Sequence, residues 1–536
     1  MKTNISRRTF IRYCTSGTVA LGMGQIGCGG GSGDEDGTGS GSIDEDGIGS
    51  GGIGEGGTGS GSGDADGSGS DGSGEDDLSG SISPLTNDES IILGRPTDST
   101  ISISAITDSD SDIYFEYGTE PGIYTDSTAT YETTKGVPLD IELINLIPNT
   151  RYYYRMRSRA LKDYDSGDTL FLEREECSFM TQRDKGSTFT FAIIADDHLP
   201  QYWPSQNHAI ELYERSISNI NRDNPDFVFN LGDTFWGQDA ADEEDVYYCH
   251  EYQRPYIGGY AKSAPLFIVL GNHEGEQGWQ LNSTGRNKAV WSTLARKYYY
   301  LNPEPNDFYS GSTTVEDFVG LRQNYYSFEW GDALFIAIDP YWYTTRNPMA
   351  SKNNWDWTIG DEQYKWLKKT LEESNAKFKF IFCHNMTTGT NNYACGGIEF
   401  VDYDIAGNGS FEWGGQNEDG SWGLSSKRPT WDKPIHQLMV DNNVSALFHG
   451  HDHVFFHQEL DGIVYQECPK PSDPSYSEGF VERSEYKYGH QENASGYIRV
   501  TVSEYEVNVE YVRSYREEDE SSARINGEVV YSYKIK

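Results

Sequence analysis

This sequence has few basic residues, few cysteines and no long apolar run. Its 42 Lys and Arg residues face 84 Asp and Glu residues, so the formal net charge is -42. A field of that sign repels nucleic acid and anionic membrane surfaces, which argues against a protein that binds a nucleic-acid backbone. The 7 cysteines are too few for a disulfide scaffold. No apolar run approaches the ~18 residues that a membrane-spanning helix needs.

The first 28 residues have the pattern of an export signal. They contain four basic residues and no acidic one, and a weakly apolar stretch covers residues 18–26. The run Ser6-Arg7-Arg8-Thr9-Phe10-Ile11 resembles a twin-arginine signal. Cys28 follows Gln25-Ile26-Gly27, which resembles a lipoprotein cleavage box. We therefore predict export by the twin-arginine route and lipid attachment at Cys28, with ordinary cleavage nearby as the alternative.

Residues 29–82 consist almost entirely of Gly, Ser and acidic residues. They hold 13 acidic residues and no basic one, and Asp34-Glu35-Asp36-Gly37 recurs as Asp44-Glu45-Asp46-Gly47. Such a segment cannot bury enough surface to offset its ordering entropy, so we predict a disordered tether. As a flexible coil it would span roughly 40 Å. Calcium binding by the repeats is the alternative.

Residues 84–182 are predicted to form a small all-β sandwich. Residues 101–106 alternate between apolar and polar side chains, as a half-buried strand does. Residues 146–154 contain three consecutive tyrosines and have the pattern of a sandwich corner, in which a Tyr hydroxyl binds upstream backbone. A run of strands of this length without a helical pattern indicates a fibronectin type III-like domain.

Residues 187–512 repeat one design five times: a buried-looking strand runs into polar residues with metal-ligand side chains. The strands cover 189–195, 227–231, 266–270, 378–383 and 444–448, and the motifs after them are Asp196-Asp197-His198, Gly232-Asp233, Gly271-Asn272-His273-Glu274, His384 and His449-Gly450-His451-Asp452-His453. Amphipathic helical patterns lie between them, which predicts α/β layers with the polar residues gathered at the strand ends. Oxygen and nitrogen ligands without a thiolate fit two divalent or trivalent metals.

The motif order D-x-H, G-D, G-N-H-E, H, G-H-x-H is similar to that of the calcineurin-like metallophosphoesterase superfamily. Together with the sandwich in front, the chain resembles the purple acid phosphatase branch. The resemblance implies a four-layer α/β/β/α sandwich over residues 187–536, completed by C-terminal strands. Two positions depart from that branch, which carries Gly at His198 and a ligating Tyr at Trp236. Without that tyrosinate, we do not expect a ferric charge-transfer centre.

By position, the resemblance implies two groups of three ligands joined by one bridging carboxylate. These are Asp196, His198 and His453 for the first metal, Asn272, His384 and His451 for the second, and Asp233 as the bridge. The two ions would be manganese, iron or zinc, and a hydroxide bridging them would attack phosphorus. The cations would also neutralise the phosphate, which a strongly acidic protein otherwise repels.

Four further residues are predicted to act beside the metals. In the family, the residue at His273 faces the leaving group, so we expect a general acid or transition-state donor, oriented by Glu274, that contributes roughly 10²–10⁴ in rate. A hydrogen bond to the scaffold is the alternative role of His273. Arg346 follows the strand 334–338 and is predicted to contact phosphate, with a surface charge as the alternative. Asn385 follows His384, where many phosphatases of the branch place a second His, and is also predicted to contact substrate.

The sequence thus predicts an exported phosphoesterase, held at the cell envelope or surface by its lipid anchor alone, that hydrolyses phosphate monoesters. Its partner would be a small phosphorylated substrate. Because the twin-arginine route carries folded proteins, metals could be loaded before export, which would let manganese or iron be retained against zinc and copper. The alternatives are a phosphodiesterase, nucleotidase or phosphotriesterase with the same site, and a non-catalytic surface adhesion protein.

Overall fold

The computed structural model describes residues 90–161, 170–199, 206–237, 240–390, 392–477, 483 and 485–535. The predicted export signal (1–28), the lipidation site Cys28 and the tether (29–82) lie outside these residues. Within the described ranges, no helix combines the length and the apolar character needed to cross a bilayer.

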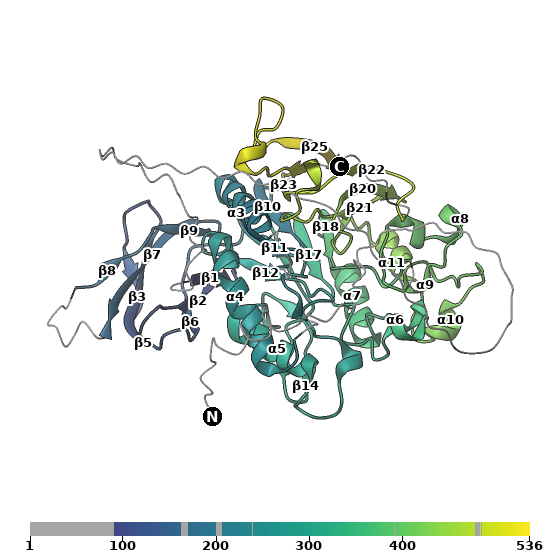
Figure 1. Ribbon diagram of the computed structural model, residues 1–536, viewed down its shortest axis with the longest axis horizontal. Helices are drawn as coiled ribbons and strands as arrows, with labels where there is room; N and C mark the ends of the chain where they lie inside the picture. Colours follow the sequence, from purple (N-terminus) through teal and green to yellow (C-terminus); the bar gives the residue numbers. More distant parts are fainter. Residues whose placement is uncertain are drawn as a thin grey trace, which may run out of the picture. The chain divides into compact units, whose positions relative to one another are not determined.

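The first domain is an all-β sandwich, as predicted (Figure 1). One sheet contains β1 (Ser90–Gly94), β2 (Ile101–Ile106) and β6 (Leu139–Leu143); the other contains β4 (Asp126–Ser127), β3 (Ser111–Gly118), β7 (Arg151–Ala160) and β8 (Leu172–Glu173), with β5 (Tyr131–Thr133) on β3 and β9 (Cys177–Met180) on β7. Side chains such as Ile103, Phe115 and Phe179 fill the space between the sheets. The hydroxyl of Tyr152 accepts a hydrogen bond from the backbone N–H of Ile147 at 2.9 Å, which confirms the predicted corner.

The second domain begins with a six-stranded sheet. Its strands lie in the order β12 (Leu266–Ile268), β11 (Val228–Asn230), β10 (Phe189–Ile194), β23 (Tyr497–Val502), β24 (Val507–Val512) and β25 (Val529–Ile535). The first three are mutually parallel, and the three C-terminal strands are antiparallel, each to its neighbour. The predicted C-terminal strands therefore extend the sheet that contains β10.

The facing sheet has eight strands. They lie in the order β13 (Ser310–Gly311), β16 (Tyr326–Trp330), β17 (Ala333–Ala337), β18 (Phe378–Phe382), β19 (Ala446–His449), β21 (Ile463–Glu467), β20 (Phe455–Leu460) and β22 (His490–Glu492). Strands β17, β18, β19 and β21 are parallel to one another. Shorter elements outside both sheets are β14 (Val315–Glu316), β15 (Gly320–Leu321), α5 (Lys288–Tyr299), α6 (Pro348–Ser351), α8 (Tyr403–Ala406), α9 (Phe411–Gly414) and α10 (Leu424–Lys427).

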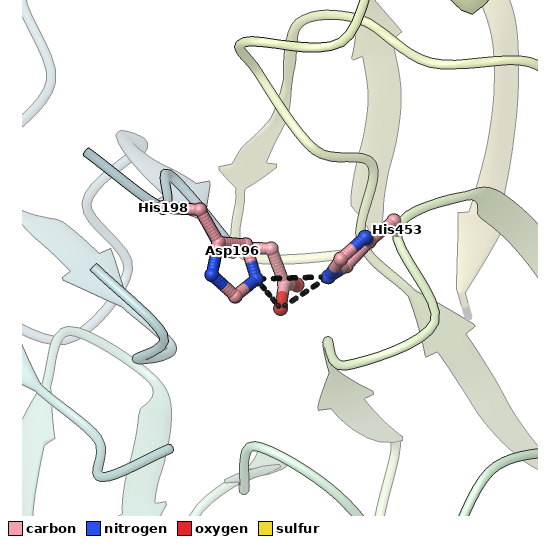
Figure 2. Close-up of side chains that lie close together, drawn as sticks. All are labelled: Asp196, His198 and His453. Atoms are coloured by element: carbon pink, nitrogen blue, oxygen red, sulfur yellow. Dashed lines mark hydrogen bonds and ion pairs between the residues drawn. The ribbon is translucent and has the colours of Figure 1, made fainter. Parts of the chain in front are cut away.

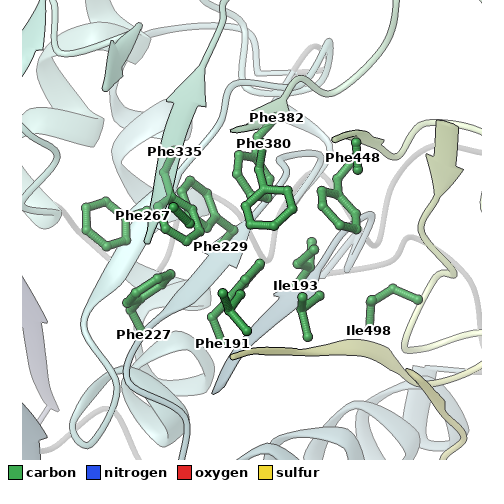
Figure 3. Packing of buried hydrophobic residues seen from close by; sticks show 14 of the residues in the cluster. Phe191, Ile193, Phe227, Phe229, Phe267, Phe335, Phe380, Phe382, Phe448 and Ile498 are labelled. Atoms are coloured by element: carbon green, nitrogen blue, oxygen red, sulfur yellow. The ribbon is translucent and has the colours of Figure 1, made fainter. Parts of the chain in front are cut away.

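Phenylalanine rings hold the two sheets together. Phe191, Phe229, Phe335, Phe380 and Phe382 are all buried in the space between them (Figure 3). The rings of Phe229 on β11 and Phe382 on β18 stack with centroids 3.9 Å apart. Because each of these side chains buries a large apolar area, the stack sets the spacing between the sheets.

Helices cover the outer face of each sheet. Because side chains alternate along a strand, Ala192 and Ile194 of β10 point away from the phenylalanine core and pack against α3 (Gln206–Asp223) and α4 (Glu243–Ala261). In the same way, Leu334 and Ile336 of β17 pack against α7 (Asp361–Glu373) and α11 (Ile435–Asp441). The predicted four-layer α/β/β/α sandwich is confirmed (Figure 1).

Four buried charges form a network beside the last residues of the G-N-H-E motif. Glu276 forms ion pairs with Arg296 and Arg322, and Arg322 also contacts Asp339 at 2.9 Å. The Glu276 side chain is 1% exposed. Burial alone would raise the pKa of its carboxyl, but the two guanidinium groups outweigh this and hold the pKa at about 2. The ionised carboxylate is therefore part of the folded structure.

We expect Glu276→Gln to lower the free energy of unfolding by about 3 kcal/mol at neutral pH, because it leaves the buried Arg296 guanidinium without its counter-charge and leaves Arg322 paired with Asp339 alone. The pKa of Glu276 is depressed from 4.5, so its stabilisation is present above pH 4.5 and is lost as the pH falls toward 2. The urea midpoints of wild type and variant should thus converge on acidification. Glu373→Gln, on the exposed face of α7, is the matched control. A gap that stays constant with pH would contradict this account.

Candidate metal centre

The predicted ligands follow five parallel strands that end at one edge of the molecule's core. Asp196 and His198 follow β10, Asp233 follows β11, and Asn272 follows β12 in the first sheet. His384 follows β18, and His451 and His453 follow β19 in the second sheet. The carboxyl ends of parallel strands meet at the same edge of a sheet, which brings together residues that are far apart in the sequence.

Five of the seven predicted ligands adopt left-handed backbone conformations. Their φ values are 62° for Asp196, 49° for His198, 53° for Asp233, 84° for His451 and 62° for His453. Residues with a Cβ rarely occupy this region, and such conformations persist where surrounding contacts hold them, as at functional sites. Here the backbone N–H groups of Asp196 and His198 donate to the carbonyls of Gly232 and Asp233 at 2.9 and 3.0 Å.

Asp196, His198 and His453 form the first group of possible ligands (Figure 2). The Nε2 atoms of the two imidazoles lie 2.9 Å apart, and they lie 3.8 and 3.5 Å from Oδ1 of Asp196. The other oxygen, Oδ2, accepts a hydrogen bond from the backbone N–H of His451 at 2.9 Å, whereas the buried Oδ1 has no hydrogen-bond partner among the described residues. Two imidazole nitrogens and one carboxylate oxygen that converge on one point fit a cation.

Asp233, His384 and His451 form the second group, with Asn272 beside it. Nε2 of His384 lies 3.1 Å from Oδ2 of Asp233, 3.1 Å from Oδ1 of Asn272 and 3.2 Å from Nδ1 of His451. The opposite nitrogens lie near carbonyl oxygens: Nδ1 of His384 near Leu231 at 2.8 Å, and Nε2 of His451 near Tyr393 at 2.9 Å. If these nitrogens carry the protons, Nε2 of His384 and Nδ1 of His451 are free to bind a metal.

Asp233 belongs to both sides of the site. Its Oδ1 accepts a hydrogen bond from the N–H of His273 at 2.8 Å. Its Oδ2 faces His384 at 3.1 Å and His198 at 3.8 Å, so one oxygen lies between the two groups. Burial raises the pKa of Asp233 and of Asp196, and burial lowers the pKa of His198 and His453. Buried carboxylates and neutral imidazoles of this kind fit two bound cations.

His273 lies beside the ligands. Its Nε2 is 3.6 Å from Oδ2 of Asp233, and its buried Nδ1 has no hydrogen-bond partner in the part of the chain that the structure describes. The ring makes edge contacts with His198 and Trp236, with centroids 4.9 and 4.2 Å apart. With His198 and Asp233 it also forms a third possible ligand group. The structure therefore places this imidazole beside the metal ligands. Among the described residues, no hydrogen bond to its ring fixes which nitrogen carries the proton.

The expectation that Glu274 orients His273 is wrong. Its carboxylate accepts hydrogen bonds from the backbone N–H groups of Asp233, Thr234 and Gly271 at 2.9, 2.9 and 2.6 Å. A side chain at Gly271 would overlap Asp233 and Glu274, so glycine is required there. Glu274 therefore positions the loop that carries Asp233, and the two motifs are joined by this carboxylate.

Trp236 stacks on a ligand of the first group. Its ring lies 4.4 Å from the ring of His198, with 30° between the planes. The indole has no anionic oxygen with which to replace a tyrosinate. The two positions that depart from the purple acid phosphatase pattern therefore lie side by side, with their rings in contact.

The two residues predicted to contact substrate differ in burial and in the contacts that they make. Asn385 is buried, and its carboxamide accepts a hydrogen bond from the Tyr341 hydroxyl and donates to the carbonyl of Met386 at 2.8 Å. Arg346 has a side chain that is 69% exposed, and its ion pair among the described residues is with Asp356 at 3.5 Å. The structure therefore places Asn385 next to His384, whereas it shows no ion pair between Arg346 and the ligand groups in the described chain.

Two acidic residues next to ligands hold the loops in place. Oδ2 of Asp197 accepts hydrogen bonds from the Tyr213 hydroxyl at 2.7 Å and from Asn230 at 3.1 Å. Oδ2 of Asp452 accepts from the N–H of Gly396 at 2.7 Å and from the Tyr486 hydroxyl at 2.6 Å. Both are buried, so they support the ligand loops from behind.

One basic residue at the site was not predicted from the sequence. Lys470 follows β21, and its charge acts on Asp196, Asp197 and Asp233. The signal that could have revealed it is the Pro469-Lys470-Pro471 sequence, since prolines on both sides restrict the backbone of a lysine.

Comparison with known proteins agrees with this geometry. Residues 189–455 match the family described as calcineurin-like phosphoesterase. Among solved structures the chain is similar to PhoD, with 12% identity and a TM-score of 0.55 over 84% of this chain and 90% of that chain. It is also similar to purple acid phosphatase PPD1 from yellow lupin (Lupinus luteus) seeds, with 15% identity and a TM-score of 0.53 over 84% of this chain and 74% of that chain. A search of curated proteins finds no match.

At such sequence identities, the two solved structures show the fold alone. The family match identifies the type of reaction. The matched residues run from Phe189, at the start of β10, to Phe455, two residues after His453, and so include every predicted ligand. The family match, the motifs at five strand ends and the two ligand groups agree. This chain belongs to the calcineurin-like phosphoesterases and is a metal-dependent phosphoric ester hydrolase.

Proposed function

We propose that this protein is an exported phosphatase that hydrolyses phosphate monoesters with two bound metal ions. The observation that carries the proposal is the position of Asp233 Oδ2, which faces His384 at 3.1 Å and His198 at 3.8 Å. A single carboxylate oxygen between the two ligand groups suits a pair of cations that share it. Bound there, manganese, iron or zinc ions would acidify a water molecule and neutralise phosphate oxygens.

The ligands fall into two groups of three and one shared residue. Asp196, His198 and His453 would hold the first cation. Asn272, His384 and His451 would hold the second, and Asp233 would be shared by both. Glu274 keeps the bridging loop in place through its three backbone hydrogen bonds. Trp236 covers one face of His198, which limits the access of water from that side.

His273 would give a proton to the leaving oxygen. Its Nε2 lies 3.6 Å from the bridging carboxylate, and its ring is 90% shielded from solvent. Nδ1 has no hydrogen-bond partner among the described residues, so the scaffold does not fix the proton on either nitrogen. An imidazole in such a position can donate a proton to an alkoxide as the ester bond breaks.

One observation favours the same chemistry on other esters. The Asn385 carboxamide, which stands where many phosphatases of the branch have a second His, is engaged by Tyr341 and Met386. A donor to the second charge of a monoester is therefore missing at that position. A phosphodiesterase, nucleotidase or phosphotriesterase is the alternative function.

A matrix of metals and substrates tests the proposal. We expect an aryl phosphate to be hydrolysed with a higher kcat/KM than its bis-aryl diester after loading with manganese, iron or zinc. Asp233→Ala should retain little metal by elemental analysis and show no activity with any metal, because the two ligand groups lose their shared anion. Asp419→Ala, at an exposed turn, is the control. Faster cleavage of the diester would assign the alternative function instead.

His273→Ala should keep both metals and lower kcat by about 10²–10⁴, since it removes only a proton donor. The loss should be larger for an alkyl phosphate than for a nitrophenyl phosphate, because nitrophenolate leaves without protonation. A variant that loses metal would show that His273 is a ligand. An equal loss with both leaving groups would show that it does not protonate them.

We also propose that export follows the twin-arginine route and ends with a lipid on Cys28. Seven ligands from five separate segments form the metal site only after folding. A route that carries folded proteins would allow the metals to be bound before export, and the acidic residues 29–82 would separate the enzyme from the anionic membrane surface.

Replacing Arg7 and Arg8 together by Lys should leave the protein inside the cell with its signal intact, because the paired guanidinium groups are the recognised feature. Arg12→Lys is the matched control and should be exported normally. Cys28→Ser should still be exported but should appear in the soluble fraction. Fractionation followed by mass measurement of the N-terminal peptide distinguishes these results. Unchanged export of the double variant would contradict the route.

A further inference from the structure

Lys470 brings a positive charge to the edge of the metal centre. It lies in the segment after β21, and its charge interacts with three carboxylates and three imidazoles of the site. These are Asp196, Asp197 and Asp233, and His198, His273 and His453. In a chain with 84 acidic and 42 basic residues, a lysine at this place is a local exception to the charge balance.

The segment that carries Lys470 is tied to two ligand loops. The backbone N–H of Cys468 donates to the carbonyl of His449 at 2.7 Å, at the end of the strand before His451. The hydroxyl of Ser472 donates to the carbonyl of Asp197 at 3.0 Å, next to His198. The segment therefore spans the gap between the loops that carry the first group of ligands.

The backbone of Lys470 has little freedom between these two ties. Pro469 and Pro471 are buried on either side of it. Proline fixes its own φ, and a residue that precedes proline is restricted to extended conformations. The lysine stem therefore leaves a rigid backbone at a defined place, which is what a binding contact requires.

Among the described residues, no ion pair or hydrogen bond involves the ammonium group. Four carboxylates attract it: Asp473, three residues along the chain, and Asp196, Asp233 and Asp197 of the site. Arg483, the other cation that acts on His453, donates to the carbonyl of Asp452 at 2.7 Å. Lys470 is partly exposed, so its three N–H donors are available to a ligand that enters the centre.

We propose that Lys470 binds the phosphate group of the substrate and gives the site its preference for monoesters over diesters. This inference rests on the proposed phosphatase function and names the residue that selects the substrate class. A phosphate monoester is largely a dianion at neutral pH, whereas a diester carries one negative charge. An ammonium group beside the cations interacts with that additional charge, a donor that the Asn385 carboxamide does not supply.

The test compares Lys470→Met, which removes the charge and keeps the stem, with Lys470→Arg, which keeps the charge. Lys369→Met on the exposed face of α7 is the matched control. The first measurement is the affinity of metal-loaded protein for inorganic phosphate by titration calorimetry. We expect Lys470→Met to weaken binding about 10- to 100-fold, as removal of a charge-assisted hydrogen bond does, and Lys470→Arg to retain most of it.

The second measurement is kcat/KM for an aryl phosphate and its bis-aryl diester, with metal content determined on the same samples. Lys470→Met should lower the monoester value by a similar factor, mainly through KM, lower the diester value by a clearly smaller factor, and leave the metal content unchanged. Unchanged phosphate affinity and an unchanged ratio of the two esters would overturn the proposal. Loss of metal or of thermal stability in Lys470→Met but not in Lys470→Arg would overturn it too, by showing that the charge only balances the carboxylates.

The two proposals can fail separately. If wild-type protein hydrolyses neither ester with any metal, the proposed function is wrong, while the phosphate affinities still decide whether Lys470 binds the anion. If wild type prefers the monoester and Lys470→Met keeps that preference, the function stands and the role of Lys470 does not.

Discussion

Two buried carboxylates among neutral imidazoles are the constraint on which this structure depends. Asp196 and Asp233 are at most 1% exposed, and no ion pair to Lys or Arg neutralises them in the described chain. An uncompensated buried carboxylate is costly, and its pKa rises accordingly. Bound cations remove this cost, so metal binding and stability of the site are expected to be linked.

The packing of the two sheets determines where these ligands meet. Phe229 and Phe382 stack between the sheets a few residues before Asp233 and His384. From the same strand ends, Nδ1 of His384 reaches the carbonyl of Leu231 in the other sheet at 2.8 Å. Since protein interiors are close-packed, a change of ring size in this core would move one half of the metal centre relative to the other. The relative positions of the metal ligands therefore depend on the packing of the apolar core.

The net charge of the chain and the charge inside the site have opposite effects on an anionic substrate. The chain as a whole is strongly acidic and repels anions, whereas the proposed cations and Lys470 make the interior of the site attractive to a phosphate group. Such a site binds its substrate through short-range contacts and without long-range steering.

The sequence pattern predicted the order of the strands and motifs, the all-β domain and the gathering of ligand side chains at strand ends, because these are local features. The four layers and the division of the seven ligands were implied by the resemblance to a known family. Contacts between segments could not. Glu274 binds the backbone of Asp233 rather than the imidazole of His273, and Lys470 reaches the site from a segment with no ligand pattern. Secondary structure depends mainly on neighbouring residues in the sequence. Hydrogen-bond partners and charge pairs depend instead on which loops the packed sheets bring within about 3 Å of one another.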